Sequence, residues 1–164
     1  MDRLRGPHFI NVDLEVWSRT DLTPFDEAVQ AIAFVLYAGK IRRRFLVSLE
    51  ARLPKVTSPE DAIWGLLKIV DGLPPAARKA WKGAQSRIFN VGYQGGEFVT
   101  LLRERPVGSS RWYAVNPRRA ARSCETSFTP KLLDAVAKVG GTITTTIYPP
   151  TREVPSQRKK PIRR

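Results

Sequence analysis

The stretch 9–17, FINVDLEVW, constrains the fold more than any other, because its apolar and polar residues alternate strictly. Ile10, Val12, Leu14 and Val16 fall on one face of an extended chain, and the polar residues between them fall on the other. A strand of this kind is buried on one face only, as in an antiparallel sheet with one solvated face. The pattern predicts a half-buried strand near the start of the chain.

Helix start signals follow this strand at several places. Each combines an N-cap hydroxyl with a Pro at the first helical position, as in Thr23-Pro24, Ser58-Pro59 and Thr129-Pro130. Gly72 and Gly140 supply end signals for the second and third of these helices. A further, more basic helix is expected over 74–85.

Extended segments separate the helices. We expect a hairpin of strands 32–38 and 43–51 that turns near Ala38-Gly39-Lys40. A second hairpin is expected from 87–94 and 97–102, with its turn at Gly95-Gly96. Further strands are predicted at 111–117 and at 142–148, where Pro149 and Pro150 follow.

Strands and helices are mixed along the chain without strict alternation, which favours the α+β class. We expect a single domain with a mostly antiparallel sheet and helices packed on one face, ferredoxin-like in its broad architecture. The 164 residues are enough for one hydrophobic core. The expected organisation is an N-terminal arm at 1–8, the domain at 9–150 and a flexible basic tail at 151–164.

Positive charge is the unusual quantity of the composition. The chain has 28 Lys and Arg against 15 Asp and Glu, a net charge of +13. The cations gather in three clusters, which we predict to be anion-binding: Lys40, Arg42, Arg43 and Arg44; Arg118, Arg119 and Arg122; and Arg158, Lys159, Lys160, Arg163 and Arg164. A basic surface of this kind favours a polyanion such as the backbone of RNA or DNA as partner.

Signatures of cofactor or covalent chemistry are missing from the sequence. His8 is the one histidine and Cys124 the one cysteine, so no His-His metal pair or thiolate cluster can form, and a Ser-His-Asp triad could be built only around the terminal His8. Gly92, Gly95 and Gly96 match neither the P-loop nor the dinucleotide-binding spacing. We expect no cofactor, no metal, no membrane association and a cytoplasmic address.

Three carboxylates leave one enzymatic alternative open. Asp13, Glu15 and Glu50 are predicted to share one face of the sheet, where they could bind a divalent metal as in a nuclease. The more ordinary interpretation is that Asp13 and Glu15 pair with Arg42 and Arg44 across neighbouring strands. We favour the ion pairs, because the carboxylates follow no fixed motif spacing.

These features predict a non-enzymatic, small basic binding protein that contacts a polyanion without sequence specificity. The alternative from another class is a protein-interaction module, such as an adaptor or a toxin-neutralising partner. It would use its sheet edge or an apolar surface around Trp17, Trp81 and Trp112. A metal-dependent nuclease is the third and least favoured hypothesis.

Overall fold

The alternating segment at the start of the chain forms β1 (His8–Ser18), the middle strand of the sheet. It pairs antiparallel with β3 (Arg44–Ala51) on one side and with β4 (Ser86–Gln94) on the other. β2 (Ala33–Ile41) pairs antiparallel with β3, and β5 (Thr142–Tyr148) pairs parallel with β4. The strand order is therefore β2-β3-β1-β4-β5.

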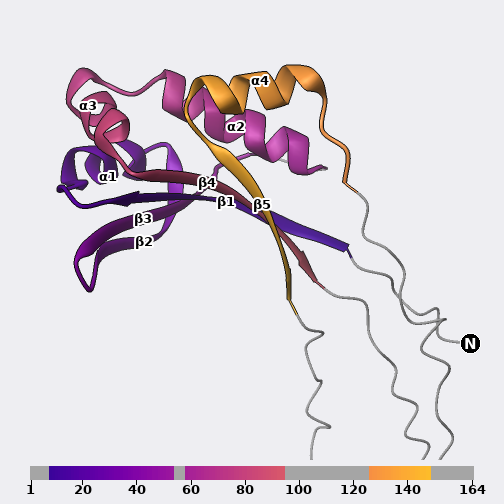
Figure 1. The fold of residues 1–164 in the computed structure, drawn as a ribbon, viewed down its shortest axis with the longest axis horizontal. Coiled ribbons are helices and arrows are strands. Elements are labelled where there is room, and N and C mark those ends of the chain that lie inside the picture. Colours follow the sequence, from indigo (N-terminus) through magenta and orange to yellow (C-terminus); the bar gives the residue numbers. More distant parts are fainter. Residues whose placement is uncertain (1–7, 54–57, 95–125, 149–164) are drawn as a thin grey trace, which may run out of the picture.

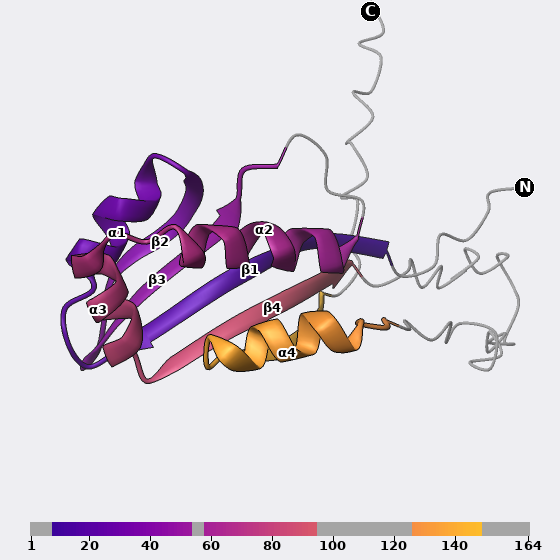
Figure 2. The ribbon, with the colours of Figure 1, turned by 90° about the horizontal axis from the view of Figure 1, so that it is seen from above.

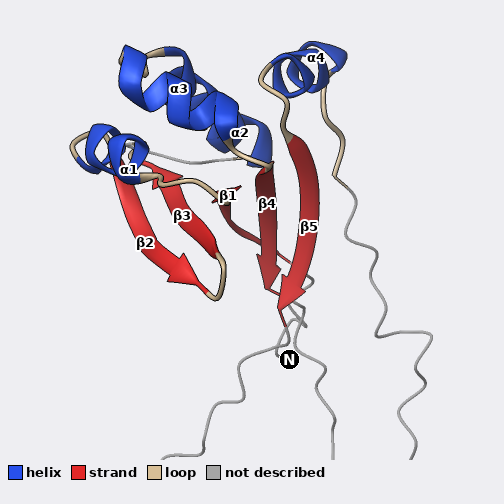
Figure 3. Ribbon diagram, turned by 60° about the vertical axis from the view of Figure 1, so that its left-hand side comes forward, coloured by secondary structure: helices blue, strands red, loops and turns tan. Residues whose placement is uncertain are grey.

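Four helices accompany the five strands: α1 (Thr23–Gln30), α2 (Pro59–Asp71), α3 (Pro75–Gly83) and α4 (Pro130–Lys138). All four lie on the same side of the sheet (Figures 1 and 3). Seen from above, α2 runs lengthwise over the middle strand (Figure 2).

This computed structural model describes residues 8–53, 58–94 and 126–148. They form a single α+β domain with a mixed, mostly antiparallel sheet, as the sequence predicts.

The core lies between the sheet and this helix layer. β1 contributes Val12, Leu14 and Val16, which are at most 3% exposed, because its alternation turns them all toward the helices. The apolar stripe of α2 and the buried side chains of α1, α3 and α4 cover them, among them Phe25, Ile63, Leu66, Ala77 and Leu132. Every helix thus buries one face against the sheet or another helix.

Ile10 departs from the predicted alternation. The pairing of β1 with β4 shifts between Phe9 and Asn11, so Ile10 is the extra residue of a β-bulge and is 44% exposed. Phe9 packs against the core instead, with its ring 6.0 Å from that of Tyr93. A bulge inverts the alternation locally, which explains why the buried face begins one residue earlier.

The helix starts agree with the sequence at two of three places. The Ser58 hydroxyl accepts a hydrogen bond from Asp61 N at 3.1 Å, and the Thr129 hydroxyl accepts one from Leu132 N at 3.3 Å. The predicted N-cap Thr23 is wrong by one residue. Leu22 occupies that position, while Thr23 is already helical and donates to the Asp21 carboxylate.

The turn between β2 and β3 lies later than predicted. β2 continues through Gly39 and Lys40 to Ile41, and the chain reverses at Arg42-Arg43. Arg42 takes the left-handed conformation that the tight turn requires, with φ at 55°. Gly39 stays in the strand, where the Tyr37 ring lies so close that a Cβ would be 3.0 Å from its hydroxyl.

Several expectations concern residues that lie outside the described ranges. They are residues 1–7 of the arm predicted at 1–8, the strand at 97–102 and its turn at Gly95-Gly96, the strand at 111–117, and the tail at 151–164. His8, the last residue of that arm, belongs to β1. No helix in the described part is long and apolar enough to cross a membrane.

Candidate functional site

The sheet has one face that the helices leave uncovered (Figure 3). The polar residues of β1 lie on this face, because the residues between them are buried under the helices. We call it the open face. Asn11, Asp13, Glu15 and Trp17 alternate with the buried residues of this strand, and all four are partly buried. On the neighbouring strands Ser48 lies opposite Glu15, and Asn90 opposite Asp13. The open face therefore has a polar centre.

Asn11 connects two carboxylates at this centre. Its side-chain amide donates to Asp13 Oδ1 at 2.9 Å and to Glu50 Oε1 at 2.5 Å. A Cβ at Gly92, the nearest residue of β4, would lie 2.6 Å from Asn11 Oδ1, so this position has no room for a side chain. Asp13 and Glu50 are thereby held together on adjacent strands.

Proximity and burial change the acidity of Asp13. Burial is the largest cause that raises the pKa of Asp13, followed by its hydrogen bond with Glu50. The negative charges of Glu50 and Glu15 raise it further, to about 7. Below about pH 7 Asp13 therefore keeps a proton, which it shares with Glu50 in a hydrogen bond. Their role within the described part is to hydrogen-bond with each other and with Asn11.

The predicted ion pairs between these acids and Arg42 or Arg44 are wrong. In the described ranges, Asp13 contacts Asn11 and Glu50, while Glu15 accepts a hydrogen bond from Trp17 Nε1 at 3.1 Å. The reason is distance along the strands: Glu15 faces Ser48, whereas Arg44 pairs with Ile41 at the hairpin end. Arg42 lies beyond the ladder, in the turn.

The nuclease hypothesis requires a group of carboxylates around one metal ion. Within residues 8–53, 58–94 and 126–148, no three His, Cys, Asp or Glu side chains are arranged to hold one. Asp13 and Glu50 come together as the sequence predicts, but Glu15 is held by Trp17.

The first basic cluster forms the tip of the β2–β3 hairpin. Arg42, Arg43 and Arg44 are all exposed, and Val47 and Leu49 are turned to the core, as the alternation predicts. Lys40 is exposed too, with its ammonium 5.6 Å from the centre of the Phe45 ring. In the described part none of the four cations forms an ion pair.

The other two basic clusters lie outside the described ranges. They comprise Arg118, Arg119 and Arg122, and Arg158, Lys159, Lys160, Arg163 and Arg164. The described ranges carry 13 of the 28 Lys and Arg and 10 of the 15 Asp and Glu, a net charge of +3 out of +13. Most of the positive charge thus belongs to the remaining segments.

Exposed apolar side chains gather on the edge strand β2. Five of the nine large hydrophobic residues that are exposed in the described part lie on this strand or directly before it. They are Ile32 (46%), Phe34 (55%), Leu36 (52%), Tyr37 (42%) and Ile41 (38%). Leu36 is exposed because the pairing with β3 shifts between Val35 and Tyr37, which leaves it in a bulge.

The apolar surface predicted around the tryptophans is wrong for the two that the structure describes. Trp81 is 4% exposed and packs against Phe25, with 5.8 Å between ring centres. Trp17 is partly buried and bound to Glu15. Trp112 lies outside the described residues. The sequence feature that corresponds to the exposed apolar surface of β2 is the run Phe34–Tyr37, in which all four residues are apolar and no polar residue alternates with them.

Comparison with known proteins gives no match. No family model, no curated protein and no solved structure resembles this chain.

Proposed function

We propose that this protein is a protein-interaction module that binds an extended segment of a partner chain along β2. The observation that carries the proposal is the unprotected edge. Among the described residues β2 pairs with β3 on one side only, and it exposes apolar side chains. Soluble proteins usually protect an edge strand with charges, prolines or a covering loop, because its unpaired N–H and C=O groups can hydrogen-bond with a strand of another chain.

The charges of β2 support this proposal. Lys40 is the one charged residue between Ala33 and Ile41, and it lies at the hairpin end. The segment before it therefore has no charge of its own that an added strand would bury, while the Arg52 guanidinium lies 4.9 Å from the centre of the Phe34 ring. Backbone hydrogen bonds would supply affinity, and the exposed side chains at alternate positions would supply specificity.

The opposite edge, β5, provides a comparison. Its exposed large hydrophobic residues are Ile147 and Tyr148, at the end of the strand, and the rest of it is rich in Thr. Pro149 and Pro150 follow directly in the sequence. Proline cannot donate to a ladder, so this edge is less suited to strand addition.

A matched pair of substitutions tests the proposal. Leu36→Lys places a charge on the β2 edge, and Ile147→Lys makes the same change on β5. Both side chains are exposed, at 52% and 59%, so both variants should fold. Partners captured from an extract of the source cells by the wild type should be lost with Leu36→Lys and kept with Ile147→Lys.

A second measurement locates the contact. In the purified complex, hydrogen exchange should slow at the β2 amides and not at those of β5. Equal capture by both variants, or protection elsewhere, would refute the proposal. A wild type that sediments as a dimer while Leu36→Lys sediments as a monomer would identify the added strand as a second copy.

Polyanion contact is the second candidate function, supported by the hairpin tip. Lys40, Arg42, Arg43 and Arg44 are exposed and form no ion pair within the described ranges. Arginine suits bidentate contact with phosphate, and the segments outside these ranges add further cations. The salt dependence of binding to a nucleic acid tests this second function.

We also propose a ferredoxin-like plan for the first four strands. It is supported by their order, β2-β3-β1-β4, in which each neighbour is antiparallel.

A further inference from the structure

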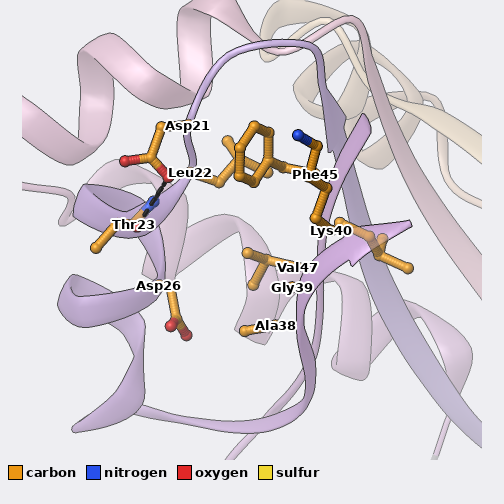
Figure 4. A pocket seen from close by; sticks show the side chains of 10 residues that line it. Asp21, Leu22, Thr23, Asp26, Ala38, Gly39, Lys40, Phe45 and Val47 are labelled. Atoms are coloured by element: carbon orange, nitrogen blue, oxygen red, sulfur yellow. Dashed lines mark hydrogen bonds between the residues drawn. The ribbon is translucent and has the colours of Figure 1, made fainter. Parts of the chain in front are cut away.

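A small pocket of about 160 Å³ lies between the start of α1 and the hairpin end of β2 and β3. Asp21 and Asp26 line it from the helix side, and Ala38, Lys40 and Val47 line it from the strands (Figure 4). Two carboxylates against one ammonium make the lining acidic, although the hairpin tip beside it is basic.

Asp26 is the unusual residue of this lining. Its Oδ2 accepts a hydrogen bond from Gln30 at 3.2 Å, but its Oδ1 is buried and has no hydrogen-bond partner in the described ranges. A buried carboxylate oxygen without a donor costs free energy, so such groups are nearly always paired. A donor from outside the chain would satisfy it.

The other charged groups of the pocket are already engaged. Asp21 Oδ1 accepts two hydrogen bonds, from Thr23 N at 3.0 Å and from Thr23 Oγ1 at 2.8 Å, and these lower its pKa, so it stays ionised. The Lys40 ammonium lies over the Phe45 ring and forms no ion pair in the described ranges. In the described ranges neither of these two groups is paired with Asp26.

The pocket borders the edge strand. Ala38 lies opposite the buried Val47, so its side chain is on the helix side of β2. A strand added to β2 would place every second side chain on this same side, about 5 Å from its neighbour on β2. A Lys or Arg next to Ala38 would have the length to reach the Asp26 carboxylate.

We propose that the pocket receives the cationic head of a Lys or Arg from the strand that pairs with β2. This inference rests on the proposed function and specifies its partner: an extended segment with a basic residue at the helix-side position beside Ala38. A charge-assisted hydrogen bond to a partly buried carboxylate is among the stronger polar contacts, so this residue would fix the register of the added strand.

A small cation tests the pocket independently of strand addition. n-Propylguanidinium chloride is titrated into ¹⁵N-labelled protein, with tetramethylammonium chloride at equal ionic strength as the reference. We expect saturable shifts of the Asp26, Ala38 and Val47 amides with the guanidinium alone. Asp26→Asn should weaken this binding about ten-fold, while Glu27→Gln, an exposed change on the same helix, should not. Absent shifts, or equal binding to Asp26→Asn, would overturn the inference.

Two peptides test the pocket and the edge together in the wild-type protein. They are acetyl-Thr-Val-Thr-Lys-Thr-Val-Thr-amide and its analogue with norleucine in place of Lys. Slower hydrogen exchange of β2 with the Lys peptide, and about ten-fold weaker binding of the analogue, supports both proposals. Equal protection by both peptides keeps strand addition and overturns the role of the pocket. Guanidinium binding without protection of β2 by either peptide keeps the cation site and refutes strand addition.

Discussion

At the scale of single residues, the open face shows how close packing changes the chemistry of ordinary side chains. Asp13 and Glu50 would repel each other if both were ionised. They remain side by side because Asn11 donates to both and because Asp13 keeps a proton. A raised pKa of this origin is a property of the folded state, so it couples protonation to stability.

The stability of the protein should therefore fall as the pH rises from about 4 to about 7. Asp13 has a pKa of about 7 in the folded protein against 3.8 ordinarily. Between these values the folded state holds a proton that the unfolded state has released, and raising the pH removes that advantage. Above the folded pKa the contribution levels off. Asp13→Asn should flatten this part of the profile, measured by urea unfolding at several pH values.

Asp134→Asn, on the exposed side of α4, is the control for this measurement and should keep the wild-type slope. Parallel profiles for the wild type and Asp13→Asn between pH 4 and 7 would show that the shared proton does not exist.

At the scale of elements, the β2–β3 hairpin combines an apolar surface on β2 with a cationic turn. β2 exposes apolar side chains, while the turn exposes cations. The turn also carries a cost, because Arg42 adopts a positive φ of 55° that a residue with a Cβ rarely takes. Glycine would take this conformation more readily.

Arg42→Gly should accordingly raise the free energy of unfolding, by up to about 1 kcal/mol, because relief of the left-handed strain outweighs the added entropy of the unfolded chain. Arg43→Gly removes the same charge from the same turn without a positive φ to relieve, so it should lower stability. Chemical denaturation of the two variants measures the free energy of unfolding of each and so tests this prediction. Equal effects of both changes would mean that charge rather than backbone strain governs this turn.

At the scale of the whole molecule, charge is divided unevenly. The described ranges hold a net charge of +3 of the chain's +13. A polyanion would therefore meet cations from the hairpin tip and from segments outside these ranges. Each phosphate contact with a single strand should contribute about −0.7 to the slope of log K against log salt.

Deletion of residues 151–164 should weaken binding to a labelled oligothymidylate and make the slope shallower by a few units, without abolishing binding. That segment has six cationic residues and one acid, so it offers contacts but little apolar surface to orient them. Changing Arg42, Arg44, Arg118 and Arg119 together to Ala should remove most of the binding that remains after this deletion. Fluorescence anisotropy across a salt series measures both effects.

Two results would contradict this prediction. The intact protein could show no salt-sensitive binding to nucleic acid, which would leave the interaction module as the function. Alternatively, deletion of residues 151–164 could abolish binding completely, and that segment would then be the site itself.

Local patterns in the sequence were sufficient to predict much of the fold. The alternation of β1 from Val12 onward and the Ser58 and Thr129 caps were correct, because each depends on residues within a few positions of one another. The predicted position of Asp13 and Glu50 on one face was also correct, but not their partners.

The tertiary structure decided the features that depend on register and on strand order. The bulges at Ile10 and Leu36 shift the pairing by one residue, and nothing in the local pattern marks them. The edge position of β2 turns an apolar run into an exposed surface, and the approach of α1 to this hairpin creates the pocket at Asp26. Such features arise from contacts between residues distant in the chain, whose free energies are set by packing and not by local propensity.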